Sequence, residues 1–234
     1  IAWHYRAGNT KARYLPNWEH NKLEEFIWWA VPIAIIAVLA VITWRSAHAL
    51  DPFRPLDSSV PPLEVEVVSL DWKWLFMYPA EGIATVNYLE IPVGTPVAFK
   101  LTSDAPMNAL WIPALAGQEM TMPGMVTQLH IEADAPGRYQ GLSSNYSGEG
   151  FAGMNFPVVA TSTEAFAAWA AQVKASGAPL ARDSYMMLAK PSENVPAAFY
   201  RLADENLYTY IVMQYMVPPA ASSTMSDMGA MSGM

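Results

Sequence analysis

The sequence contains no cysteine among its 234 residues. The absence of thiolates excludes disulfide bonds, iron–sulfur clusters, zinc sites with cysteine ligands and every copper site that needs a thiolate. Charge is also scarce: only 15% of the residues are charged, and acidic residues outnumber basic ones, for a formal net charge of −8. A nucleic-acid-binding surface needs a basic patch, so we exclude nucleic acid as a partner.

One long uncharged run lies near the start of the chain. Residues 26–44 read FIWWAVPIAIIAVLAVITW, which as a helix would be about 28 Å long, close to the hydrocarbon thickness of a bilayer. Trp28, Trp29 and Trp44 near its ends are typical of side chains at the headgroup level. Pro32 should kink this helix, and a neighbouring helix would compensate for the lost hydrogen bond. The run therefore predicts a transmembrane helix.

Basic residues are more frequent before this span than directly after it. Four precede it and two follow in the nearest stretch: Arg6, Lys11, Arg13 and Lys22, then Arg45 and Arg54. Because basic residues are enriched on the cytoplasmic side of a membrane helix, residues 1–25 are predicted to be cytoplasmic and the rest of the chain to lie outside.

Residues 45–62 include the proline-rich stretch DPFRPLDSSVPP, typical of a stiff linker between a membrane segment and a globular domain. From residue 63 to residue 161, short apolar, β-branched and aromatic runs recur at intervals of about ten residues, with proline and glycine between them. This pattern predicts a mainly β chain in which residues 63–161 fold as a β-sandwich.

Residues 162–217 are predicted to form C-terminal helices. The pattern Thr161-x-x-Glu164 suggests a capping box, followed by an apolar stripe at helical spacing and a stop at Gly177. A second helix is expected between Asp204 and Met216. Residues 218–234 are predicted to be a disordered tail, whose regularly spaced methionines would either bind copper(I) weakly or serve no metal at all: Met225, Met228, Met231 and Met234.

The segment LSSNYSGEGFAGM, residues 142–154, resembles the ligand loop of subunit II of haem–copper oxidases. In that loop two cysteines four apart, a glutamate between them, a histidine four later and a methionine three after that hold a binuclear copper centre. The remaining histidine of the motif corresponds to a place in the segment TSDAPMNALWIP. Carried over one by one, the ligand places fall on one retained ligand, Met154, and on five substituted positions: Asn108, Ser143, Asn145, Ser147 and Phe151.

Copper chemistry agrees with this loss. A cupredoxin copper site needs thiolate and imidazole ligands, and residues 63–161 contain a single histidine, His130, in an alternating strand pattern. We therefore predict that this chain binds no metal or other cofactor, and that the loop is packed with Phe151 in the space of an imidazole and metal.

The resemblance continues through DWKWLF, GIATVN and MNALWIP into the C-terminal region, and is strongest to the cytochrome bo-type ubiquinol oxidases, whose second subunit lacks the copper centre. It implies a cupredoxin-like Greek-key β-sandwich with an N-terminal transmembrane helix and a small C-terminal helical extension. The family normally has one more transmembrane helix, so residues 1–25 resemble the end of a hairpin loop. A menaquinol oxidase could carry a similar subunit, which leaves the quinone open.

The resemblance also implies partners and a location. Haems and copper are expected in subunit I, which would also bind the ubiquinol, and subunits III and IV and membrane lipid are further expected partners. The chain would lie in a bacterial inner membrane with its C-terminal domain in the periplasm, as a non-catalytic subunit of a proton-pumping oxidase.

Glu25 stands one residue before the hydrophobic span. In the family a glutamate at the matching place lies at the mouth of a proton-uptake channel, which makes Glu25 a candidate for the channel entrance. An acidic residue near a helix N-terminus also complements the helix dipole, and that explanation applies equally to Glu24.

Two other functions compete with an oxidase subunit. A single-span cupredoxin-like domain could be a binding or sensor module that recognises an extracellular partner. A copper electron carrier is the third possibility, and the absence of cysteine argues strongly against it.

Overall fold

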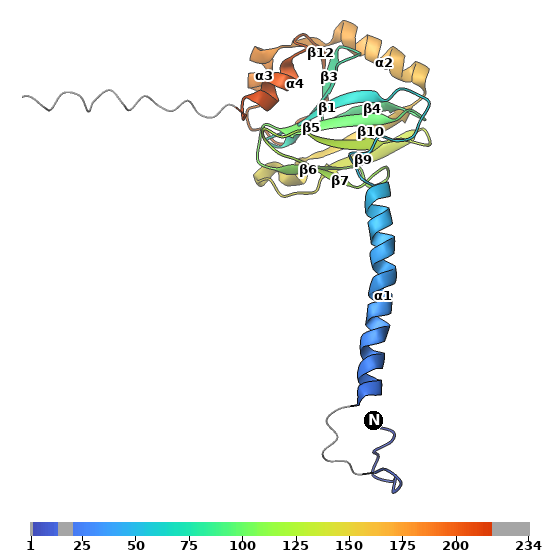
Figure 1. Cartoon of the computed structure of the whole chain (residues 1–234). Coiled ribbons are helices and arrows are strands. Elements are labelled where there is room, and N and C mark those ends of the chain that lie inside the picture. The colour runs from blue at the N-terminus through green and yellow to red at the C-terminus, as the bar shows by residue number, and fades with distance from the viewer. Residues whose placement is uncertain (1, 14–20, 217–234) are drawn as a thin grey trace, which may run out of the picture. The chain divides into compact units, whose positions relative to one another are not determined.

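The computed structural model describes residues 2–13 and 21–216 (Figure 1). The chain divides into two compact units, Ile1–Asp51 and Pro52–Met234, each of which is described by itself. The predicted disordered tail, residues 218–234, and part of the predicted cytoplasmic segment, residues 1 and 14–20, lie outside the described residues.

The first unit contains one long helix, α1 (Lys22–Ala49). The side chain of Asn21 caps it by accepting from the backbone N–H groups of Leu23 and Glu24, at 3.1 and 3.4 Å. The helix extends beyond the predicted span 26–44 at both ends, so residues 45–49 are helical and do not belong to the linker. Glycine and proline are absent from 45–51, and Pro52 is the first residue that cannot continue the helix.

No residue of α1 is buried within the described part of the chain. It is the one described helix that is long and apolar enough to cross a membrane. A soluble surface rarely shows so large an apolar area, so this helix fits the predicted membrane span.

The second unit is a sandwich of two sheets. The seven strands of sheet A follow in spatial order: β11 (Ala178–Leu180), β12 (Ala198–Leu202), β3 (Ile83–Val86), β2 (Lys73–Tyr78), β1 (Leu63–Leu70), β5 (Val97–Ser103) and β8 (Thr127–Ile131). Sheet B has five: β4 (Leu89–Pro92), β10 (Asn155–Thr161), β9 (Gly137–Ser143), β6 (Asn108–Trp111) and β7 (Gln118–Thr121). The pairs β1–β5, β4–β10 and β11–β12 are parallel, and the others are antiparallel. The predicted mainly β, cupredoxin-like sandwich with an N-terminal apolar helix is confirmed.

The main core lies between the two sheets. Alternate residues of the long strand β1 face it: Val65 and Val67 are fully buried there. Trp74 and Phe76 of β2 meet Phe156 of β10, with ring centroids 6.2 and 5.0 Å apart. Large aromatic side chains therefore join the two sheets near the start of β10. This start lies next to the loop that forms the candidate site.

Sheet A is buried on its other face as well, where the helices α3 (Arg182–Leu188) and α4 (Leu207–Met213) pack in a second core. Val68 and Leu70 of β1 point into this core, opposite to Val65 and Val67. The prediction of helices alone for residues 162–217 is wrong, because β11 and β12 extend sheet A. The five residues AFYRL of β12 alternate between half-buried and exposed, a pattern too short to stand out in the sequence.

The helix α2 (Thr163–Ser176) packs against β12, β4 and β3 (Figure 1). Its predicted capping box is wrong by one residue: Ser162 is the cap, and its hydroxyl accepts from the N–H of Ala165 at 3.2 Å. Thr161 instead ends β10, and its hydroxyl donates to Glu90 at 3.3 Å. The predicted stop at Gly177 is the C-cap.

Candidate functional site

The loop that resembles a copper-binding loop connects β9 to β10. Ser143 ends β9 and Met154 directly precedes β10, with the 3-10 helix η1 (Glu149–Gly153) between them. The N–H of Ser143 donates to the carbonyl of Met154 at 3.2 Å, which closes the loop. A further backbone bond of 3.1 Å, from Ser144 to Ala109 of β6, holds the loop against that strand.

Four of the six residues that the resemblance predicts at ligand places gather around one sulfur atom. Sδ of Met154 accepts from the side-chain amide of Asn108 at 3.3 Å, from the hydroxyl of Ser143 at 3.4 Å and from that of Ser147 at 3.7 Å. The Asn108 amide also donates to the hydroxyl oxygen of Ser147 at 3.1 Å. Since Asn108, Ser143 and Met154 are all buried, these hydroxyl and amide groups satisfy one another and the thioether away from water.

The other two positions lie at the outside of this cluster. The amide of Asn145 donates to the carbonyl of Met107 at 2.9 Å. The ring of Phe151 is half-buried and meets Tyr146 edge to face, with centroids 5.6 Å apart. The proposed role of Phe151 as a filler of the former metal space thus stays a prediction, and its ring contact is with Tyr146.

The donor set of the cluster does not fit a binuclear copper centre. Copper sites of this kind use thiolates and imidazoles, whereas the cluster offers one thioether together with hydroxyl and amide groups. Within residues 2–13 and 21–216, no three His, Cys, Asp or Glu side chains lie close enough to hold a metal ion. His130 stands in β8 of the other sheet, where its Nδ1 lies 2.9 Å from the carbonyl oxygen of Pro52.

Known proteins resemble this chain over most of its length. Residues 64–163 match the family described as cytochrome c oxidase subunit II, periplasmic domain, and residues 174–219 match the COX aromatic rich motif. The chain is 51% identical over 215 residues to cytochrome bo(3) ubiquinol oxidase subunit 2 of Pseudomonas putida, which covers 92% of this chain and 68% of that protein. The chain belongs to the quinol oxidase subunit 2 family.

Two further relatives are also named as subunit 2 of a ubiquinol oxidase. Ubiquinol oxidase subunit 2 of Acetobacter aceti is 49% identical over 92% of this chain and 70% of its own length. The cytochrome bo(3) ubiquinol oxidase subunit 2 of Pseudomonas aeruginosa is 50% identical, and the chain spans 65% of its length. Among solved structures, the periplasmic domain of subunit II of a Bradyrhizobium japonicum cytochrome oxidase superposes with a TM-score of 0.46 at 21% identity, over 48% of this chain and 95% of that one.

Two tryptophans fix the altered loop of this family member to sheet A. The indole N–H of Trp74 donates to the hydroxyl of Ser143 at 3.0 Å, and that of Trp72 donates to the carbonyl of Ser147 at 3.1 Å. The two residues do not share a strand: Trp74 lies in β2, which begins at Lys73, and Trp72 lies in the preceding turn with a positive φ of 65°.

The close approach of Trp72 explains two glycines in the loop. A Cβ at Gly150 would lie 2.5 Å from Cγ of Trp72, and a Cβ at Gly148 would lie 3.0 Å from its ring. Gly148 also has a φ of 120°, which other residues rarely adopt. The glycines of the loop are visible in the sequence, but Trp72 is 75 positions away from Ser147 in the chain, so their contact depends on the tertiary fold.

Glu25 lies in the other unit, in the first turn of α1. Its backbone N–H donates to the carbonyl of Asn21 at 2.9 Å, which places it within the regular helix rather than before it. Glu24 lies in the same first turn, where a negative charge complements the positive end of the helix dipole. The local structure is thus compatible with both roles considered for Glu25, the dipole partner and the proton-channel entrance.

Proposed function

We propose that the chain is the non-catalytic subunit II of a membrane-bound terminal oxidase that oxidises ubiquinol, reduces oxygen to water and pumps protons. Subunit I would hold the haems and copper and bind the ubiquinol. This chain would assist assembly and cap the periplasmic face of subunit I, in contact with subunits III and IV and with lipid of the bacterial inner membrane.

The observation that carries this proposal is the cluster around the sulfur of Met154. The groups that replace the copper ligands donate to a thioether instead of holding a redox-active metal. A subunit built in this way offers no electron port for a soluble one-electron donor. A quinol dissolved in the membrane needs no such port, because it can deliver electrons to the haem-bearing subunit directly.

The helix α1 supports the membrane part of the proposal. Its 28 residues are about 42 Å long, enough to cross the hydrocarbon core and reach both interfaces. We further propose that Glu25, in its first turn, lies at the entrance of the proton channel of the complex.

Purification of the full chain from its own membrane in a mild detergent tests the proposal. We expect a haem-bearing partner to co-purify and the preparation to consume oxygen when ubiquinol is added. A haem-free chain recovered alone, from membranes in which ubiquinol oxidase activity stays in another fraction, would contradict it and favour a binding or sensor module.

A variant of the altered loop sharpens this test. Ser143→Ala removes one hydroxyl from the cluster without touching α1. If electrons do not pass through the loop, the ubiquinol-dependent turnover per haem should be unchanged. A large loss of turnover per haem would show that the loop takes part in electron transfer.

A further inference from the structure

Three aromatic rings from three separate elements meet beside α2. Tyr88 comes from the connection between β3 and β4, Trp169 from α2 and Phe199 from β12. The ring of Phe199 is nearly perpendicular to both others, at 68° to Tyr88 and 79° to Trp169, with centroids 5.2 and 6.5 Å away. The centroids of Tyr88 and Trp169 are 6.0 Å apart. The three rings therefore pack against one another and form an aromatic corner.

This aromatic corner, defined by Tyr88, Trp169 and Phe199, lines a pocket. The pocket has a volume of about 300 Å³, and the remaining described residues around it are Gln172, Val173 and Ser176 of α2. All three rings are partly exposed, and Phe199 is the most open at 38%. The rings are therefore accessible to a small solute, and the volume lies at the lower end of known ligand pockets.

The electrostatics of the corner favour a cation. The hydroxyl of Tyr88 donates to Oε2 of Glu90 at 2.8 Å, and Glu90 is 5% exposed. A carboxyl group behind the phenol adds negative potential to that of the ring faces. Among the described residues that line the pocket there is no lysine or arginine. Arg138 is near enough to Tyr88 to influence its pKa, but it is not part of the lining.

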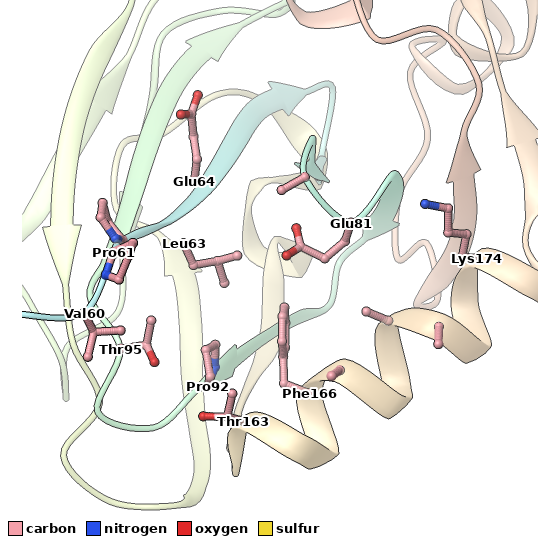
Figure 2. Close-up of a pocket in the computed structure, with 15 residues that line it drawn as sticks. Val60, Pro61, Leu63, Glu64, Glu81, Pro92, Thr95, Thr163, Phe166 and Lys174 are labelled. Atoms are coloured by element: carbon pink, nitrogen blue, oxygen red, sulfur yellow. The ribbon is translucent and has the colours of Figure 1, made fainter.

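The larger pocket on another face of α2 has different chemistry. It has a volume of about 800 Å³, and Figure 2 shows Phe166, Glu81 and Lys174 around it. Phe166 is the one aromatic side chain in its described lining, and the ammonium group of Lys174 would repel a bound cation. Oε2 of Glu81 is buried and has no hydrogen-bond partner among the described residues. No aromatic corner exists in this lining, so the two pockets should not share ligands.

We propose that the aromatic corner binds a quaternary ammonium group of the choline type. The methylated cation would lie against the faces of Trp169, Tyr88 and Phe199 and be held by cation–π attraction. Its substituent would point past Gln172 toward solvent. Such a group occurs in free choline compounds and in the headgroup of phosphatidylcholine.

Titration of the full chain with choline tests the proposal, in a maltoside detergent that carries no ammonium group. Saturation-transfer NMR on the N-methyl protons of choline measures binding. The matched neutral probe is 3,3-dimethylbutan-1-ol, which has the same shape without the charge. We expect the neutral probe to bind at least about tenfold more weakly, as loss of a cation–π contribution requires. Equal binding of both probes, or no binding of choline to the folded chain, would overturn the proposal.

Variants locate the site. Trp169→Leu and Phe199→Leu should each weaken choline binding by about tenfold or more, whereas Trp111→Leu, at an exposed tryptophan of β6, should not change it. Circular dichroism shows whether each variant is folded, and Phe199→Leu retains the test if Trp169→Leu does not fold. Unchanged choline binding in folded Trp169→Leu and Phe199→Leu would overturn the assignment.

A short-chain phosphatidylcholine below its micellar concentration distinguishes the two sources. Displacement of choline by this lipid supports a lipid headgroup as the ligand. Binding of choline that the lipid does not displace supports a free solute.

Discussion

The side-chain amide nitrogen of Asn108 lies 3.3 Å from the sulfur of Met154. These residues occupy two ligand places of the copper loop that the sequence resembles, one in β6 and one before β10. Of the two, only Met154 matches the residue type of that loop, and the Asn108 amide donates to its sulfur. The structure thus brings the two predicted positions together and joins them by a hydrogen bond.

Replacement of Met154 by leucine should destabilise the domain. The hydroxyls of Ser143 and Ser147 and the Asn108 amide would lose their common acceptor, and a buried donor without a partner costs about 1–3 kcal/mol. Thermal or urea unfolding of the full chain in detergent measures this loss. Met125→Leu is the control, because Met125 is 51% exposed. Equal stability of the two variants would show that the sulfur is not a significant acceptor.

The spacing of this loop could be recognised in the sequence, but the side-chain contacts that fix the loop to the sandwich could not. Trp74 reaches Ser143 across 69 positions and Trp72 reaches Ser147 across 75, and no local pattern encodes such contacts. The β-sandwich was predictable because short apolar, β-branched and aromatic runs recur at intervals of about ten residues, with proline and glycine between them. β12 was missed because five residues carry too little pattern, and the cap of α2 was displaced because Thr161 and Ser162 are both capable of capping.

Asp104 is expected to attach the C-terminal segment to the sandwich. It accepts from the hydroxyls of Tyr185 and Tyr215 and, at 2.7 Å, from the side-chain amide of Gln214. Asp104→Ala should expose this segment, so limited proteolysis should cut within residues 205–216 several times faster than in the native chain. Asp183→Ala, at an exposed position of α3, is the control. Identical cleavage rates for both variants would contradict the role of Asp104.

Glu66 should make the stability of the domain depend on pH. Burial, with repulsion from Glu64, raises its pKa from 4.5 to about 7, while Lys100 opposes this rise. The folded state therefore holds the proton more tightly than the unfolded state, and this stabilisation is lost as the pH rises from about 4.5 to about 7. Glu66→Gln removes the titration, so relative to the native chain its melting temperature should rise between pH 5 and pH 8.

The control for this titration is Glu149→Gln. Glu149 is exposed and is not among the groups that shift the pKa of Glu66, so its replacement should not reproduce the relative gain at high pH. A native chain and a Glu66→Gln variant whose melting temperatures change in parallel with pH would contradict the assignment.

Glu25→Gln should slow the turnover of the purified oxidase complex if Glu25 lies at the proton entrance. A neutral amide cannot exchange protons, while its size and helical position are nearly unchanged. Glu24→Gln, in the same helical turn, should leave turnover unaffected and so separates proton transfer from the helix dipole. Oxygen consumption per haem with excess ubiquinol is the measurement, and equal rates for the two variants would remove the role of Glu25.

The central claim is that the loop from Ser143 to Met154 preserves the arrangement of a copper site without its ligands. Its most direct test is a variant with five combined substitutions: Asn108→His, Ser143→Cys, Asn145→Glu, Ser147→Cys and Phe151→His. We predict that this variant binds copper and becomes coloured, and that the same variant with Phe151 retained binds it much more weakly. A folded five-substitution variant that stays colourless with excess copper would contradict the account.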